Sequence, residues 1–161
     1  MVVVKHDQWH YVLCVKTNVI DEKKRFSKEV CVKLNEYFEK AKGLGVLATS
    51  DVSGKVNVAV YSRPHFTDEG DDKMVAFIMA DRLSHANIQT NPHAAFLFIE
   101  EGQGYVGKRL HLTKVREETN AELVAAICRR CNYTMYGSES LRYVVFFNVD
   151  DVLPLIGPGP G

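Results

Sequence analysis

The sequence predicts a mainly β fold with flanking helices, in which six or more short antiparallel strands form a small barrel. Apolar and polar residues alternate along several short segments, as expected of strands with one buried face. Three of these segments follow one another without a helix long enough for a parallel crossover. Helical patterns occur only before, between and after the strands, which favours a closed or nearly closed barrel with Greek-key-like strand order.

The first half of the chain is expected to contain one helix followed by three strands. Apolar residues recur at helical spacing from Phe26 to Ala41, which predicts an amphipathic helix over 26–42. Gly43 and Gly45 follow, and we expect them to end this helix. The segments GVLATS and KVNVAVYS then predict a hairpin around the turn DVSGK, and MVAFIM predicts a third strand after the polar turn TDEGDD.

In the second half, short helices separate further strands. In DRLSHANIQTNPHAAFLF, Asp81 is expected to cap a short helix that ends before the Asn-Pro pair and leads into a strand. KRLHLTKVRE predicts the next strand, after a glycine-rich loop that lacks the Lys-Ser or Lys-Thr of a phosphate-binding loop. Thr119 and Glu122 form a predicted capping box for a helix that runs to about Cys131, and RYVVFFNVDDVL predicts the last strand.

The chain is expected to fold as one domain over 26–157. Its 161 residues suffice for a single core that buries roughly 70% of the unfolded chain's surface. Residues 1–25 are interpreted as an N-terminal extension whose role the sequence does not indicate, with a possible edge strand over 11–15. Residues 158–161 are interpreted as a flexible tail.

The composition argues against nucleic-acid and membrane partners. Lys plus Arg and Asp plus Glu number 20 each, so no net charge attracts a polyanion or an anionic membrane. The apolar start MVVV is too short for a signal peptide, and no apolar run of 18 residues could span a bilayer. We therefore expect a cytoplasmic protein.

The four cysteines are expected to be reduced thiols. Cys128 and Cys131 form a C-x-x-C motif, but a zinc site would need a second pair or two suitably spaced histidines. The pair lies late in a predicted helix, where both thiols share a face with apolar neighbours. We interpret them as small buried hydrophobic residues rather than as a redox or metal site, and we predict no metal site elsewhere.

The residues after Asp81 suit a phosphate group. Arg82, Ser84 and His85 occupy the start of the predicted short helix. A helix N-terminus offers unpaired backbone amides and a positive partial charge, and the Arg and hydroxyl add donors. The alternative is that Arg82 is a solvated helix-start residue and Ser84 a cap or surface hydroxyl. The pattern favours a phosphorylated cofactor that lies on the sheet.

Taken together, these segments resemble the pyridoxamine 5′-phosphate oxidase-related, FMN-binding split-barrel family. The resemblance runs from about Gly43 to about Gly157. It is carried by the segments Ser50 to Pro64, Asp81 to Phe98 and Gly107 to Glu117 in that order.

The resemblance implies an FMN-binding split barrel that works as a homodimer, with FMN in the groove between two barrels. It places the flavin ring and ribityl chain against two strands and the phosphate at the start of the short helix. A cation near the pyrimidine edge of the ring would stabilise the anionic reduced flavin. The implied cofactor-binding residues are Asn57, Val58, Ala59, Val60, Ile78, Met79, Arg82, Ser84, His85 and Arg109.

The chain also departs from the family pattern. Members commonly carry an adjacent Arg-Lys where this chain has Leu83 and Ser84, so one positive charge on the phosphate is missing. True pyridoxamine phosphate oxidases end in a segment with Trp and Arg, whereas the only Trp here is Trp9, so vitamin B6 oxidation is not expected. Arg63 and His65 are substrate candidates, with an acid-paired Arg and a turn His as the alternative.

The sequence therefore predicts an FMN-dependent oxidoreductase that passes hydride or electrons to or from a small molecule. It identifies no catalytic acid or base. Two alternatives stay open: a split barrel that binds haem or deazaflavin, and a non-catalytic flavin-binding or interaction domain. For haem, the candidate axial ligands are His65, His85, His93 and His111.

Overall fold

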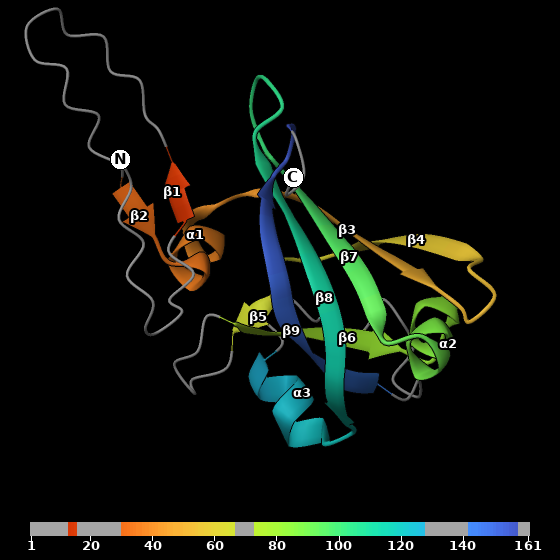
Figure 1. Cartoon of the computed structure of the whole chain (residues 1–161). Coiled ribbons are helices and arrows are strands. Elements are labelled where there is room, and N and C mark those ends of the chain that lie inside the picture. Colours follow the sequence, from red (N-terminus) through yellow and green to blue (C-terminus); the bar gives the residue numbers. More distant parts are fainter. Residues whose placement is uncertain (1–12, 16–29, 67–72, 128–141, 158–161) are drawn as a thin grey trace, which may run out of the picture.

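The computed structural model describes residues 13–15, 30–66, 73–127 and 142–157 (Figure 1). Its strands are β1 Leu13–Val15, β2 Val30–Val32, β3 Gly43–Ser50, β4 Val56–Tyr61, β5 His65–Phe66, β6 Met74–Ala80, β7 His93–Glu100, β8 Gly107–Glu118 and β9 Arg142–Pro154. Its helices are α1 Leu34–Lys40, α2 Leu83–Thr90 and α3 Ala121–Ile127. None of these helices is long and apolar enough to cross a bilayer.

Seven strands form one curled antiparallel sheet in the order β4-β3-β7-β8-β9-β6-β5 (Figure 1). The long strands β8 and β9 lie near its middle, and β4 and β5 are its two edges. Only residues 62–64 separate β4 from β5 in the chain, so one short connection joins the two edges of the sheet. The prediction of a mainly β fold with six or more antiparallel strands is confirmed.

The curled sheet encloses an aromatic core. Phe96 and Phe98 alternate with outward-facing residues along β7, and their rings lie fully buried. Phe77 from β6 lies 5.0 Å from Phe96 and 6.0 Å from Phe147 of β9, measured between ring centroids. Because strand side chains alternate between faces, one face of each central strand supplies this core and the other faces outward.

Helices α1 and α2 pack against this core, whereas α3 packs against a second cluster formed by β6 and β9 (Figure 1). Phe38 of α1 is 1% exposed and stacks edge-on against Phe98 at 5.2 Å. Ile88 of α2 is also part of the main core. Val124 of α3 packs instead in a second cluster with residues of β6 and β9. These helices cover apolar surface that the open ends of the sheet would leave in water.

A polar group also attaches α1 to the sheet. The Tyr37 hydroxyl donates a 2.5 Å hydrogen bond to the Glu100 carboxylate, and the Lys108 ammonium lies 4.2 Å from the centroid of the Tyr37 ring. Burial lowers the pKa of Lys108, and the nearby charge of Glu100 offsets only part of this effect. The Tyr37 pKa is raised by burial and by the hydrogen bond to Glu100.

The predicted helix over 26–42 is wrong in its first part. Val30–Val32 is a strand that pairs with β1, and α1 begins only at Leu34; residues 26–29 lie outside the described part. Two β-branched valines around a cysteine suit a strand, and the paired partner outweighs the helical spacing. The strand expected within 11–15 is confirmed over Leu13–Val15.

Three further local predictions are corrected. Gly43 and Gly45 do not end a helix but belong to β3. Asn120 rather than Thr119 caps α3, because its side-chain oxygen accepts hydrogen bonds from the Glu122 and Leu123 amides at 2.8 and 3.4 Å. The cap residue of α2 is Arg82 and not Asp81, and its side chain makes no capping hydrogen bond. The cysteines at positions 128 and 131 lie outside the described residues.

Candidate functional site

The edge strand β4 and the first turn of α2 are in direct contact. The side-chain amide of Asn57 donates a 2.9 Å hydrogen bond to the hydroxyl of Ser84. Burial raises the pKa of Tyr61, on the same face of β4, while its own hydrogen bond with Ser84 acts in the opposite direction. The strand predicted to contact the flavin ring and the turn predicted to hold the phosphate therefore lie side by side.

The outward face of β4 is apolar and exposed. Val56, Val58 and Val60 are 66%, 61% and 71% exposed, whereas Asn57 and Ala59 between them are half-buried. β4 pairs with β3 along one edge only. The other edge therefore leaves backbone donors and acceptors beside an apolar surface. A planar aromatic ligand with polar groups along its rim could use both features.

The first backbone amides of α2 lie outside its hydrogen-bond ladder. The first intrahelical bond runs from the Ala86 amide to the Arg82 carbonyl at 2.9 Å, so the amides of residues 83–85 precede the helical ladder. Arg82 is exposed, and its side chain makes no capping hydrogen bond. The Asp81 carboxylate is 70% exposed nearby and partly offsets this positive charge.

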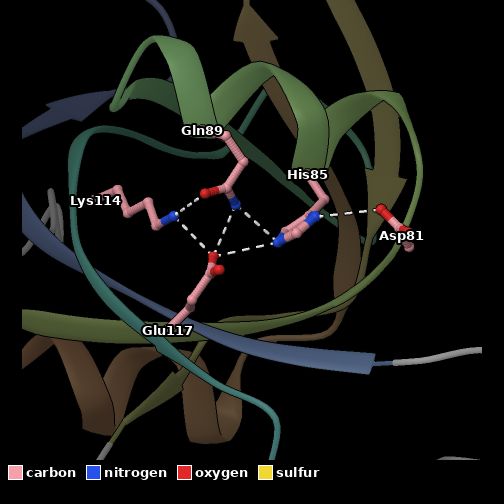
Figure 2. Close-up of polar contacts among 5 residues, drawn as sticks. All are labelled: Asp81, His85, Gln89, Lys114 and Glu117. Carbon is pink, nitrogen blue, oxygen red and sulfur yellow. Dashed lines mark hydrogen bonds and ion pairs between the residues drawn. The ribbon is translucent and has the colours of Figure 1, made fainter.

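His85 lies in a hydrogen-bonded network beneath this turn (Figure 2). Its side chain is almost fully buried, and its Nε2 lies 3.2 Å from Glu117 Oε2 and 2.8 Å from Gln89 Nε2. Gln89 also donates to Glu117 at 2.8 Å, and the Lys114 ammonium lies 2.7 Å from the same carboxylate oxygen. On the other side of the ring, Nδ1 lies 3.6 Å from Asp81.

This network ties α2 to β8 and β9. The His85 ring stacks on Tyr143 with 3.8 Å between centroids and an interplanar angle of 18°. Burial acts to raise the pKa of Glu117, but the hydrogen bonds from Lys114 and Gln89 outweigh it and hold the pKa below its usual value. Because its ring is committed to these internal contacts, His85 is placed to support the turn from within.

The other predicted cofactor residues are distributed differently. Met79 is fully buried in the main core, and Ile78 packs in the cluster beneath α3. A ligand at α2 could therefore reach the backbone of β6 but not the Met79 side chain. Arg109 donates hydrogen bonds to the carbonyls of Pro154 and Gly157 at 3.0 and 3.3 Å, so its guanidinium holds the end of β9.

The two substrate candidates, Arg63 and His65, contact or belong to regular elements of the fold. Arg63 donates through Nη1 to the carbonyls of Phe38, Glu39 and Ala41 at 2.6, 3.1 and 2.9 Å. It therefore caps the C-terminus of α1, and the partners of its Nη1 are backbone carbonyls rather than an acid. His65 is 8% exposed within β5, so it is neither a turn residue nor an open substrate contact.

The outer face of the sheet holds a cavity of about 460 Å³. It lies across β3, β7, β8 and β9 and reaches the first residue of β4. Two of its residues, His93 and His111, were expected from the sequence only as candidate axial ligands of haem. The lining residues are Ala48, Thr49, Ser50, Val56, His93, Ala94, Ala95, His111, Leu112, Asp150 and Asp151. Among the described residues, no group of three or more His, Cys, Asp or Glu is arranged to hold a metal ion.

Comparison by sequence finds no relatives: no family model matches the chain, and no curated protein matches it. Comparison by structure finds several. An FMN-binding protein from Syntrophomonas wolfei subsp. wolfei is 20% identical, with a TM-score of 0.61 over 79% of this chain and 86% of that one. HupZ from Group A Streptococcus is 18% identical, with a TM-score of 0.58 over 80% and 96% of the two chains.

A third similar structure is HutZ, the haem storage protein from Vibrio cholerae. It is 20% identical, with a TM-score of 0.55 over 76% of this chain and 92% of that one. The three proteins include an FMN binder and a haem storage protein, so the likeness identifies the architecture and not the ligand. The chain therefore has the split-barrel fold of pyridoxamine 5′-phosphate oxidase-like, FMN-binding proteins, as its sequence predicts.

Proposed function

We propose that this protein binds FMN and acts as a homodimeric flavoprotein oxidoreductase on a small molecule. The observation that carries this proposal is the contact between Asn57 and Ser84, which joins the exposed strand β4 to the start of α2. One nucleotide can then use both surfaces, with its phosphate at the helix and its ring at the strand. The similar FMN-binding protein gives independent support.

The phosphate would be held at the start of α2 by the amides of residues 83–85 and the guanidinium of Arg82. The Arg82 side chain makes no capping hydrogen bond to these amides, and its guanidinium is an exposed positive charge at this turn. Ser84 is 6% exposed and already binds Asn57, so it would act mainly by positioning the turn. With one fixed cation and Asp81 close by, we expect moderate rather than tight affinity.

The ring would lie against residues 57–60, with a second copy of the chain completing the site. Three exposed valines in a row on an edge strand form an apolar surface that a partner would cover. Bound FMN would supply hydride- and electron-transfer chemistry through its ring. The chain's own residues would orient the ring and exclude water from it.

FMN titration of the purified protein tests cofactor binding. We expect quenched flavin fluorescence and a shifted absorbance spectrum on binding. Arg82→Gln should raise the dissociation constant about 10- to 100-fold, because it removes a charge-assisted bond worth about 1.5–3 kcal/mol. Lys40→Gln, an exposed change on α1, should leave the affinity unchanged. FMN that stays fully fluorescent with the wild-type protein would refute the proposal, and a Soret band after addition of haemin would favour the haem alternative.

Sedimentation equilibrium tests the dimer. We expect the wild-type protein to sediment as a dimer. Val58→Asp should shift the equilibrium toward the monomer, because dimer formation would bury the new carboxylate in the interface. Val52→Asp is the matched control, since Val52 is 81% exposed in the turn before β4. A monomeric wild-type protein, or equal effects of both variants, would count against a valine-lined interface.

A further inference from the structure

Two of the four cysteines are directly opposed in the small N-terminal sheet. The register of β1 and β2 places Cys14 opposite Cys31, with one further residue pair on each side. Cys14 is the middle residue of β1, and Cys31 is the middle residue of β2. Residues 15–30 separate the two cysteines in the chain, so strand pairing and not sequence distance brings their backbones together.

The spacing of opposed strand residues suits a disulfide. In antiparallel strands, the Cα atoms of directly opposed residues lie about 4.5 or 5.5 Å apart, depending on whether the pair is hydrogen-bonded. A disulfide joins residues whose Cα atoms are about 4.4–6.8 Å apart. Both spacings fall within this range, so a disulfide between Cys14 and Cys31 is compatible with the observed strand register.

The sheet of β1 and β2 is small enough for a covalent link to matter. It has two strands of three residues each, and neither strand pairs with the seven-stranded sheet (Figure 1). A two-stranded sheet is only marginally stable in water. A disulfide favours the paired state by restricting the separated chain, so it should have a large effect on these two strands.

We propose that Cys14 and Cys31 form a reversible disulfide when the protein meets a low-molecular-weight disulfide such as oxidised glutathione. The thiolate of one cysteine attacks this oxidant, forms a mixed disulfide and releases one glutathione thiolate. The thiolate of the second cysteine then attacks the protein sulfur of the mixed disulfide and releases the second glutathione thiolate. The two cysteines together lose two electrons and two protons, and the oxidant becomes two thiols.

The disulfide attaches β1 to the barrel through α1. β2 ends at Val32, and α1 begins two residues later at Leu34. Phe38 of α1 is buried in the main core, so β2 leads directly into an anchored element. Oxidation therefore fixes β1 to this element, and reduction releases it. The reduced thiols expected from the sequence are the resting form of the pair.

Peptide mapping tests the proposal in a protein that keeps only these two cysteines. Cys128→Ser with Cys131→Ser removes the C-x-x-C motif and leaves Cys14 and Cys31. With oxidised glutathione, the chain should lose about 2 Da and give tryptic peptides that are joined through Cys14 and Cys31 until they are reduced. A chain that keeps both thiols, stops at glutathione adducts or becomes linked to a second copy would overturn the proposal. Circular dichroism checks that each variant folds.

A displaced cysteine shows whether the strand register is responsible. In the same background, Cys14→Ser with Val15→Cys moves the first cysteine to the position opposite Val30. The loop to Cys31 is only one residue shorter, so its closure entropy is nearly unchanged. The equilibrium constant for disulfide formation against glutathione should fall about tenfold or more, because the pair no longer matches the register. Equal constants would show that chain flexibility brings the thiols together, which would overturn the proposal.

Hydrogen exchange measures what the disulfide does to the fold. In the two-cysteine protein, the amides of β1 and β2 should exchange about tenfold or more slowly after oxidation, because the strands can no longer separate fully. The amides of β8 should be unchanged. Cys14→Ser with Cys31→Ser is the matched control, in which the oxidant should not slow exchange in β1 and β2. Unchanged exchange in the oxidised two-cysteine protein would overturn the attachment of β1. These readouts involve no flavin, so the proposal and the FMN-binding function can fail independently.

Discussion

Arg63 and His85 illustrate how single residues acquire roles that depend on their neighbours in space. Both are polar, and both occur in segments that resemble ligand-binding motifs. In the structure, Arg63 caps a helix 22 to 25 residues before it in the chain, and His85 stacks between α2 and β9. Buried backbone carbonyls and ring nitrogens need partners, so a nearby charged or polar side chain is used to satisfy them.

Arg63→Met should destabilise the fold by about 1–3 kcal/mol, because the carbonyls at the end of α1 lose their donor. Urea unfolding followed by circular dichroism measures the change in free energy. Lys42→Met is the control, since Lys42 is an exposed neighbour of α1 and should cost less than about 0.5 kcal/mol. Equal stability of the two variants would show that the cap contributes little.

Glu117→Gln should reduce stability at neutral pH and lose this effect in acid. The pKa of Glu117 in the fold is below its ordinary value of 4.5, so its ionised form stabilises the fold above about pH 4.5. That contribution is lost as the pH falls through the lower, folded-state pKa. Urea midpoints for both proteins between pH 3 and pH 7 should converge at the acid end, and a constant difference across this range would contradict the assignment.

At the scale of elements, β3 depends on its two glycines. A Cβ atom built on Gly45 would lie 2.6 Å from the Phe96 ring and 2.7 Å from the Tyr61 carbonyl oxygen. A Cβ atom on Gly43 would meet the backbone of Ile99 even more closely. These residues let β4 and β7 approach β3 from both sides, which a helix-stop interpretation of the same glycines could not foresee.

Gly45→Ala should destabilise the protein by about 1–3 kcal/mol through overpacking against Phe96 and β4. Thermal and urea unfolding measure the loss. The double variant with Phe96→Leu should cost less than the sum of the two single changes, because the smaller side chain makes room for the methyl group. Additive costs would show that Phe96 is not what excludes a side chain at Gly45.

Elements also differ in how well local pattern identified them. The strands β3, β4 and β6 to β9 carry period-2 alternation or continuous apolar runs, and all were predicted near their observed positions. The two-residue strand β5 was not predicted, because it follows Pro64 and is too short to show a pattern. The region before α1 was assigned wrongly because VCV suits either structure by spacing, and pairing with β1 decides it. The β-bulge at Asp150, where β9 has one extra residue, has no local signal, since it reflects the offset between β8 and β9.

At the scale of the whole molecule, the curled sheet is stable only when its open ends are covered. Phe38 of α1 contacts Phe66 of β5 and also Phe96 and Phe98 of β7, which are distant from β5 in the strand order. One helix side chain thus links the edge strand β5 to the central strand β7. The packing of α1 and the closure of the sheet should therefore be lost in one cooperative transition.

Phe38→Ala should cost about 3–5 kcal/mol, the usual range for emptying a buried aromatic site. Urea unfolding should give coincident midpoints by far-UV circular dichroism and by near-UV absorbance of the tyrosines. Asn35→Ala on the same helix is the control and should have a small effect. If α1 unfolds at a lower urea concentration than the sheet, the helix is a separate unit and does not close the barrel.

The sequence by itself determined the fold class and most strand positions. It also predicted that residues 57–60 and 81–85 lie close together in space. Alternation and turn residues are local properties, so they can be recognised along a single chain. Only the tertiary structure decided that Arg63 caps α1, that His85 joins Glu117 and Tyr143, and that two aspartates line one cavity with two histidines. Each of these arrangements joins residues from different strands or helices, and the sheet register that brings them together is set by packing of the whole barrel.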